Sequence, residues 1–132
     1  MAQKRENWIR WDDVKIQTRY TTYFKSEPNG WVTAFIPAFQ LVYSAPTYEE
    51  ADSRSESMVL SFFEYQYTQA SPQKFWLEIH KLGFKATQKH DFVMKELLQK
   101  SSKKGKMSNK IDSKELPEYD KEKSKNLEYE HA

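Results

Sequence analysis

Residues 14–24 have the sequence VKIQTRYTTYF and alternate strictly between two sides of an extended chain. One side carries Val14, Ile16, Thr18, Tyr20, Thr22 and Phe24, and the other carries Lys15, Gln17, Arg19, Thr21 and Tyr23. This period of two is typical of a β-strand that is buried on one face. The rest of the chain must therefore supply neighbouring strands and a layer that covers the apolar side.

Two further strands are predicted directly after this one. The segment SEPNG places Pro28, Asn29 and Gly30 where a chain reversal needs one fixed and one permissive φ angle. WVTAFI then forms a second strand, which Pro37 ends because proline brings no N–H to a ladder. QLVYS, residues 40–44, returns as a third strand. The expected arrangement is a three-stranded antiparallel meander.

The pattern then changes to a helical period. Ala51, Ser55, Met58, Val59, Phe62 and Phe63 fall on one face of a helix predicted over residues 48–67. Thr47 and Glu50 fit a capping box at its start. A second, shorter helix is predicted over residues 72–82, with Pro72 at its first position and Gly83 just after its end. FKAT, residues 84–87, is a candidate fourth strand, and residues 91–100 have apolar side chains at helical spacing.

The 132 residues are predicted to form one domain with an extension at each end. Residues 1–13 are expected to be an N-terminal extension, and residues 14–100 the folded domain. Residues 101–132 hold eight lysines and seven acidic residues but few apolar ones. Such a segment cannot bury enough surface to offset the entropy lost on ordering. We therefore expect it to be a charged, disordered tail.

The expected fold class is α+β: a small antiparallel sheet of three to four strands with a long helix packed on one face and a short second helix. The β-β-β-α order, with GWVTAFIP on the second strand and TYEEA opening the helix, resembles the N-terminal domain of HicB-type antitoxins. The resemblance covers about residues 14–87 and also includes HKLGFKA. After Pro37 the chain continues as Ala38-Phe39-Gln40 instead of the acidic residue and Pro-Gly turn that many family members have.

The resemblance implies a partial ribonuclease H-like fold in a bacterial toxin–antitoxin system. It implies a non-enzymatic, protein-binding role in which the chain neutralises a small, basic, RNA-cleaving toxin by direct contact. Homo-oligomers are compatible with this role. Many family members add a helix-turn-helix or ribbon-helix-helix domain, but residues 101–132 match neither, so binding to operator DNA is not expected.

The sequence does not favour catalysis, a metal or a cofactor. The predicted strands at 14–24 and 31–45 contain no Asp or Glu to hold divalent ions. The chain has no cysteine, and its three histidines are scattered without a ligand spacing. No serine has a paired base, and no glycine-rich phosphate loop is present.

Two kinds of binding residue remain as candidates: side chains for contact with a partner protein, and basic side chains for contact with nucleic acid. Large amphipathic side chains dominate protein interfaces, and the candidates for contact with a partner protein are Tyr20, Tyr23, Tyr43 and Trp76. The unpaired edge of a small sheet is a second docking element for a partner chain.

The alternative function is RNA or DNA binding through a basic band. Residues 74–110 carry 10 Lys or Arg against 3 Asp or Glu. The candidate phosphate-binding residues are Lys81, Lys85, Lys89, Lys103, Lys104 and Lys106.

The start of the chain, MAQKRENWIRWDD, has no apolar region of the kind found in a signal peptide. No segment has the roughly 20 apolar residues that cross a bilayer. With the absence of cysteine, these features predict a cytoplasmic protein without a membrane partner.

Overall fold

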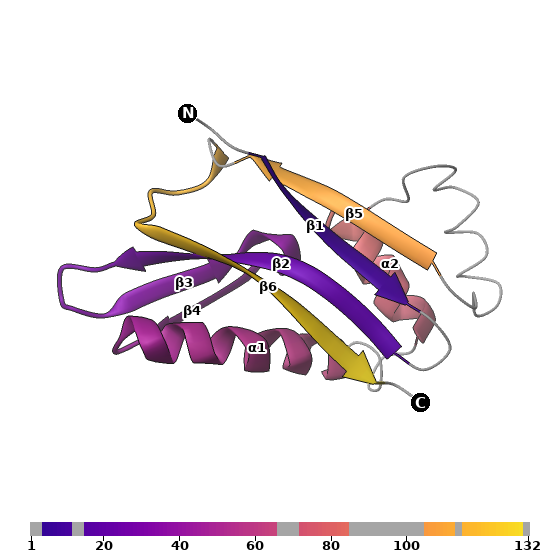
Figure 1. Ribbon diagram of the computed structural model, residues 1–132, viewed down its shortest axis with the longest axis horizontal. Helices are drawn as coiled ribbons and strands as arrows, with labels where there is room; N and C mark the ends of the chain where they lie inside the picture. Colours follow the sequence, from indigo (N-terminus) through magenta and orange to yellow (C-terminus); the bar gives the residue numbers. More distant parts are fainter. Residues whose placement is uncertain (1–3, 12–14, 66–71, 85–104, 113–114, 131–132) are drawn as a thin grey trace.

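The computed structural model describes residues 4–11, 15–65, 72–84, 105–112 and 115–130. Figure 1 shows a strongly twisted antiparallel sheet with α1 and α2 on the same side of it. The strands are β1 (Lys4–Trp11), β2 (Lys15–Ser26), β3 (Val32–Ile36), β4 (Leu41–Ala45), β5 (Gly105–Asp112) and β6 (Lys121–Glu130). The helices are α1 (Tyr48–Glu64), α2 (Pro72–Lys81) and the single 3₁₀ turn η1 (Pro37–Phe39).

The long strand β2 organises the whole sheet. One edge of β2 pairs with β6 from Lys15 opposite Glu130 to Phe24 opposite Lys121. The other edge is shared: β1 pairs with residues 16–19 and β3 pairs with residues 23–26. β4 continues beyond β3, and β5 continues beyond β1. The sheet therefore divides into a β3–β4 arm and a β1–β5 arm, and both arms pair with the edge of β2 that is opposite to β6.

Buried amide side chains replace the ladder where the two arms separate. The N–H of Thr21 donates to Oδ1 of Asn7 at 3.1 Å. Nδ2 of Asn7 in turn donates to Oδ1 of Asn109 on β5 at 2.9 Å. Because an unpaired buried amide is costly, these bonds make the division of the sheet energetically acceptable.

The turn after β3 places an aromatic ring at the centre of the main core. Pro37 ends the strand and opens η1, whose last residue, Phe39, is buried. The Phe39 ring stacks on Phe84 with centroids 5.7 Å apart and meets Phe63 edge-on at 5.5 Å. Gln40 then reverses the chain with a φ of 54°, in the left-handed region. The residues after Pro37, where the sequence departs from the HicB pattern, thus build the core.

α1 begins as predicted and buries a narrow stripe. The Thr47 hydroxyl accepts a hydrogen bond from the N–H of Glu50 at 3.1 Å, which confirms the hydroxyl half of the capping box. The buried residues repeat every four positions: Ala51, Ser55, Val59 and Phe63. Met58 and Phe62, which share the predicted face, are only partly buried.

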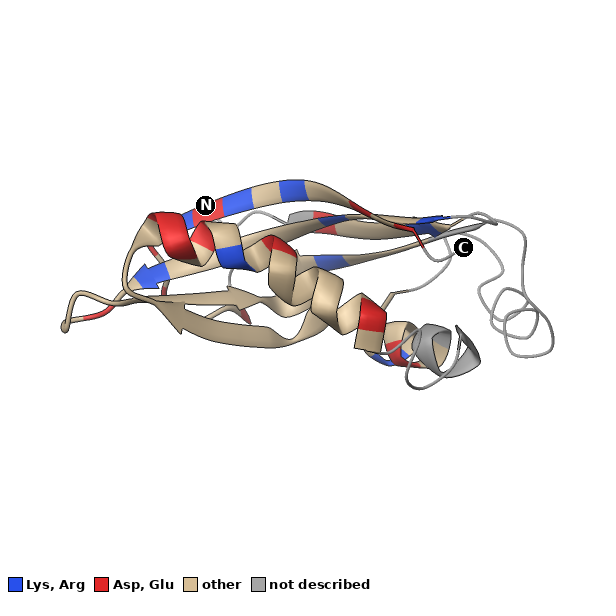
Figure 2. Cartoon of the chain, turned by 90° about the horizontal axis from the view of Figure 1, so that it is seen from below, with Lys and Arg blue, Asp and Glu red and all other residues tan. Residues whose placement is uncertain are grey.

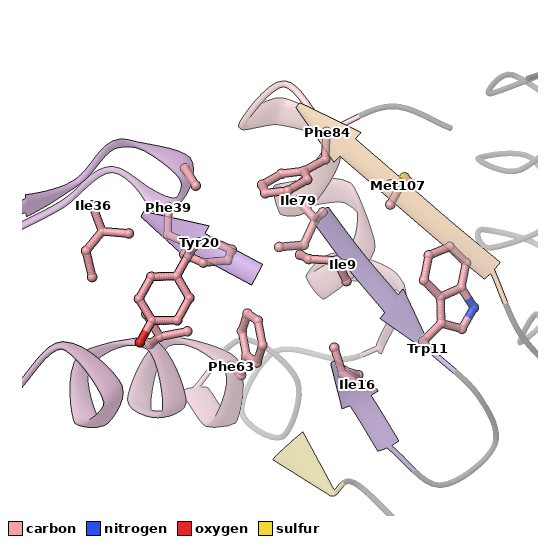
Figure 3. Packing of buried hydrophobic residues seen from close by; sticks show 12 residues of the cluster. Ile9, Trp11, Ile16, Tyr20, Ile36, Phe39, Phe63, Ile79, Phe84 and Met107 are labelled. Carbon is pink, nitrogen blue, oxygen red and sulfur yellow. The ribbon is translucent and has the colours of Figure 1, made fainter. Parts of the chain in front are cut away.

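Figure 3 shows how the core joins both arms of the sheet. Ile79 of α2 and Phe84 pack beside Ile9 of β1 and Met107 of β5, and all four are fully buried. The predicted end of α2 is also found, since Gly83 has a φ of +98° and its N–H donates to the carbonyl of His80.

The expected α+β class, with an antiparallel sheet, one long helix and one short helix, is confirmed, but the sheet is larger than predicted. The prediction of an N-terminal extension over residues 1–13 is wrong for residues 4–11, which form β1. The prediction of a disordered tail is wrong for residues 105–112 and 121–130, which form β5 and β6. The physical reason is that β6 gains stability from backbone pairing and charge partners along β2 and α1, not from apolar burial alone.

Two smaller predictions concern the segment between α2 and β5. Phe84, the first residue of the candidate fourth strand, is a buried core residue outside any strand. The rest of that candidate, residues 85–87, and the helical spacing at residues 91–100 lie outside the described residues.

Candidate functional site

The sheet has one face covered by the helices and one open face. Alternation along β2 turns Ile16 and Tyr20 toward the helices and turns Gln17 and Arg19 to the open face. On that open face a hollow of about 250 Å³ crosses β1, β2 and β6. The residues that line this open-face hollow are Trp8, Arg10, Gln17, Thr18, Asn126, Leu127 and Glu128.

Flat and charged groups surround the open-face hollow. The guanidinium carbon of Arg10 lies 4.4 Å from the centroid of the Trp8 ring, within the range of a cation–π contact. Arg19, directly opposite Trp8 on β2, donates from Nη1 to Oδ1 of Asn126 at 3.3 Å. The lining therefore combines an indole ring with one guanidinium group, and a second guanidinium, of Arg19, is bonded to the lining residue Asn126.

Glu128 supplies the acidic group of the open-face hollow. Its Oε1 accepts a hydrogen bond from Nε2 of Gln17 at 3.1 Å and lies 3.3 Å from Nζ of Lys15. Both charged partners are substantially exposed, so this ion pair contributes little to stability. Its main effect is to hold the amide of Gln17 beside the hollow.

A second feature of the open face lies on the β3–β4 arm. Trp31, just before β3, is 45% exposed, and Val42 on β4 is 69% exposed. Phe35 pairs with Val42 on the same face but is buried, and Thr33 lies between Phe35 and Trp31 along the strand. Tyr23, opposite Phe35 on β2, stacks on it at 5.6 Å, and the ring of Tyr119 meets Tyr23 edge-on. We refer to Trp31, Phe35 and Val42 as the apolar patch.

The backbone edge of β4, which the sequence suggested as a docking element, is partly occupied. Nη1 of Arg54, on α1, donates to the carbonyl oxygen of Ser44 at 2.9 Å. A charged side chain at the edge of a sheet discourages pairing with another strand. The side chains of the apolar patch are therefore more accessible to a partner than this part of the β4 backbone.

An ion cluster joins α1 to β6 on the covered face. Nζ of Lys125 lies 2.8 Å from Oδ1 of Asp52, and Nζ of Lys123 lies 2.8 Å from Oδ2 of the same carboxylate. Lys125 also reaches Oε1 of Glu56 at 3.6 Å. Figure 2 shows the acidic positions along α1. These contacts connect a helix to a strand 71 residues later in the chain.

The ion cluster shifts the titration of Asp52 and Lys123. Burial disfavours the charged form of Asp52, but the hydrogen bonds and charges of Lys123 and Lys125 outweigh it and lower the pKa of that carboxyl group. The hydrogen bond to Asp52 raises the pKa of Lys123. Each of these two residues therefore favours the charged form of the other.

The predicted partner-contact tyrosines lie in the interior. Tyr20 and Tyr23 are buried, and burial raises the pKa of Tyr20 to about 12. Tyr43 is half-buried and donates a hydrogen bond to the carbonyl of Ala51 at 2.8 Å, and burial raises its pKa as well. These tyrosines pack and orient α1 on the sheet. Trp76 falls within α2, and its side chain lies outside the described residues.

The structure describes little of the predicted phosphate-binding lysines. Lys81 ends α2 and its Nζ lies 3.5 Å from Oε1 of Glu78. Lys106 belongs to β5, but its side chain is not among those described. Lys85, Lys89, Lys103 and Lys104 lie outside the described residues. Of the six candidate lysines, Lys81 is thus the one whose side chain the structure describes.

Comparisons of the chain with protein-family models, curated proteins and solved structures found no match. Function is therefore inferred from the arrangement of side chains. Among the described residues, no group of three or more His, Cys, Asp or Glu is placed to hold a metal ion. No helix in the described part of the chain has the length and apolar character needed to cross a membrane.

Sequence reasoning missed most residues of the open-face hollow because they lie in the segments predicted to be an N-terminal extension and a disordered tail; only Gln17 and Thr18 lie in a predicted strand. Trp8 and Arg10 belong to β1, and Asn126 and Glu128 belong to β6. The missed signal was alternation. In KEKSKNLEYE, Lys and apolar side chains occupy every odd position, and acidic or neutral polar side chains occupy every even one.

Proposed function

We propose that this chain is a non-enzymatic binding protein that docks a partner protein on the apolar patch. The observation that carries the proposal is the exposure of Trp31 and Val42 on one face of one arm of the sheet. Tryptophan contributes strongly to protein interfaces.

The surroundings of the apolar patch favour a rigid docking surface. Phe35 lies against the buried Tyr23, and Tyr119 closes on Tyr23 from the other side with ring centroids 4.8 Å apart. The turn before Trp31 is held by a hydrogen bond from the N–H of Glu27 to the carbonyl of Trp31 at 2.8 Å. A preorganised surface loses little conformational entropy when a partner binds.

The charges near the patch do not by themselves select a partner. Glu27 lies in the β2–β3 turn, and Lys25, opposite Thr33, lies on the same face as the patch, whereas Glu49 and Glu50 begin α1 on the covered face. The resemblance to HicB-type antitoxins and their partial ribonuclease H-like fold supports the antitoxin-like form of this function. In this form the partner is a small, basic, RNA-cleaving toxin.

The test is capture of a partner by the full chain from its native host, with nuclease treatment and at two salt concentrations. The variants Trp31→Ala and Val42→Lys address the patch. Leu77→Lys is the matched control, because Leu77 is 36% exposed on α2, away from the patch. We expect the wild type and the Leu77 variant to recover the same small basic protein, and the patch variants to lose it.

The recovered protein is then purified and mixed with the chain in a ribonuclease assay. Inhibition at a one-to-one ratio by the wild type, but not by Val42→Lys, supports the antitoxin-like function. Equal recovery by all four proteins would exclude the patch as the docking site. Recovery of a protein without ribonuclease activity would remove the toxin from the proposal and leave protein binding.

A further inference from the structure

The open-face hollow lies on a different part of the sheet from the apolar patch. It crosses β1, β2 and β6 where β2 residues 16–19 are paired on both edges. Thr18 and Leu127 alternate toward the helices, so they line the hollow from below and form its floor. The covered face beneath it contains Ile9, Ile16 and Tyr129 of the main core cluster. The hollow therefore rests on a rigid, packed support.

We propose that the open-face hollow binds one base of a single-stranded nucleic acid, with the adjacent phosphates held by Arg10 and Arg19. This inference is independent of the proposed partner protein, since no residue that lines the hollow belongs to the apolar patch.

The first argument is the combination of ring and cations. Proteins bind single strands by stacking bases on aromatic or guanidinium planes beside a positively charged path. The guanidinium of Arg10 is stacked over the Trp8 ring, with 4.4 Å between guanidinium carbon and ring centroid, so a base can extend this stack. Arg19 lies opposite Trp8 on the next strand and supplies a second cation.

The second argument is the set of polar groups. Gln17 and Asn126 carry both donors and acceptors, and Glu128 carries acceptors only. These are the groups that hydrogen-bond the edges of bases, with a carboxylate suited to an exocyclic amino group. The ion pair with Lys15 orients Glu128, and the hydrogen bond from Arg19 orients Asn126.

The third argument is size. A volume of about 250 Å³ is at or below the lower limit of sites that enclose a whole drug-sized ligand. It suits one planar base, while the rest of the nucleic-acid strand continues across the open face of the sheet. A single strand has this geometry, whereas the bases of a duplex are stacked inside it and cannot enter.

The charge balance predicts modest affinity. Glu6, Glu122 and Glu130 alternate to the same face as Arg10 and Arg19, so the face is not a continuous basic field. With two phosphates contacted, the log–log salt slope for a single strand should have a magnitude of about 1.4. Binding should therefore weaken about 25-fold for each tenfold rise in salt concentration.

The test measures fluorescence anisotropy of labelled eight-nucleotide RNA and DNA of one mixed sequence with the full chain, with a blunt duplex of the same sequence as competitor. Trp8→Ala should weaken binding about 5- to 150-fold, as expected for loss of one stacked base. Trp31→Ala is the matched control, because it removes an exposed tryptophan from the same face outside the hollow, and it should bind as the wild type does.

Two further variants keep the test decisive if Trp8→Ala unfolds the chain. Trp8→Phe retains an aromatic plane and should restore most of the affinity. Arg19→Gln should reduce the magnitude of the salt slope by about 0.7. Comparison of the RNA and DNA arms shows whether the 2′-hydroxyl contributes.

Three results would overturn the inference: no saturable binding at low salt, equal loss of affinity in the Trp8 and Trp31 variants, or equal binding of duplex and single strand. Loss of the captured partner protein in Trp8→Phe or Arg19→Gln would also overturn it, because the hollow would then serve protein docking. Failure of the proposed partner interaction is distinguishable, since it depends on Trp31 and Val42.

Discussion

At the scale of single residues, two neighbouring phenylalanines on α1 have different environments. Phe63 is fully buried and contacts Phe39 edge-on, whereas Phe62 is only partly buried. Phe63→Ala should therefore reduce the free energy of unfolding by about 3–5 kcal/mol, and Phe62→Ala by clearly less. Denaturant unfolding of the two variants measures the difference. Equal losses would mean that the buried stripe of α1 is placed one residue away from its true position.

The buried phenol of Tyr20 makes stability depend on alkaline pH. Burial raises its pKa from 10.0 to about 12 in the folded chain, so the folded state favours the neutral phenol. The stability from this difference is complete below the unfolded pKa and is lost as the pH rises through the folded pKa, at about 1.4 kcal/mol per pKa unit. Melting temperatures measured between pH 9 and pH 12 should fall less steeply for Tyr20→Phe than for the wild type. Parallel melting-temperature curves for the two proteins would contradict the raised pKa of Tyr20. Tyr43 is present in both proteins and contributes in the same direction to each.

At the scale of elements, the charges of β6 select its register. Three lysines of β6 face α1. Lys123 pairs with Asp52, and Lys125 pairs with Glu56. Nζ of Lys121 lies 4.3 Å from the centroid of the Tyr48 ring. A slip of one residue would turn these lysines to the open face and leave Ser124, with Glu122 or Asn126, against Asp52. The alternation of charge therefore performs the role that alternating apolar residues perform on β2.

The ion cluster gives a direct test of this arrangement. Lys125 is 14% exposed, and Lys125→Glu places a third carboxylate beside Asp52 and Glu56. We expect a loss of about 2–4 kcal/mol from the variant, with about 1–2 kcal/mol recovered when Asp52→Lys is added. Lys123→Glu, at 48% exposed, should cost less. Strict additivity of Lys125→Glu and Asp52→Lys would show that the two residues do not interact.

The same cluster sets the acid side of the stability profile. Because the folded pKa of Asp52 is lowered, its contribution is present above the unfolded pKa and is lost as the pH falls through the folded pKa. Asp52→Asn should flatten the acid limb of the unfolding curve. An unchanged acid limb would assign the acid sensitivity to other carboxylates.

At the scale of the whole molecule, the two ends of the chain meet on the central strands. β6 covers the length of β2 from Lys15 to Phe24, and β5 covers β1 from Lys4 to Trp11. Pairings across about 100 residues form late and tend to make folding slow and cooperative. The aromatic cluster around Phe39 joins the arms through Phe63 on α1 and Phe84 after α2. The described elements should therefore unfold as one unit.

Removal of β6 tests this unity. A chain that ends at Asp120 loses the ladder along β2 and the partly buried Leu127 and Tyr129, so it should lose its cooperative thermal transition. This differs from the sequence-based expectation that residues 101–132 form a disordered tail. Deletion of residues 131–132 alone is the control, because it leaves Lys121–Glu130 of β6 in place. A truncated chain that melts like the full one would show that β6 contributes no stability.

The sequence by itself determined the elements whose signals are local. Alternation in residues 14–24, the Pro-Asn-Gly turn, the Thr47 cap and Gly83 each depend on neighbours within a few positions, and they predicted β2, β3, β4, α1 and α2 closely. Burial along α1 was predicted less well, because it depends on the sheet beneath the helix. Met58 and Phe62 share the apolar face, yet only Ala51, Ser55, Val59 and Phe63 meet the strands.

Only the tertiary structure decided the roles of both chain ends and of the candidate binding surfaces. β6 has too few apolar residues to predict its burial, and it is stable because β2 and Asp52 provide partners 70 to 115 residues away. The open-face hollow combines residues from β1, β2 and β6, so no single segment contains its pattern. Tyr20 falls on the apolar side of the alternation in residues 14–24, whereas Tyr23 falls on the other side. The burial of Tyr23 was decided only by the tertiary structure, in which Tyr119 packs against it on the face opposite α1.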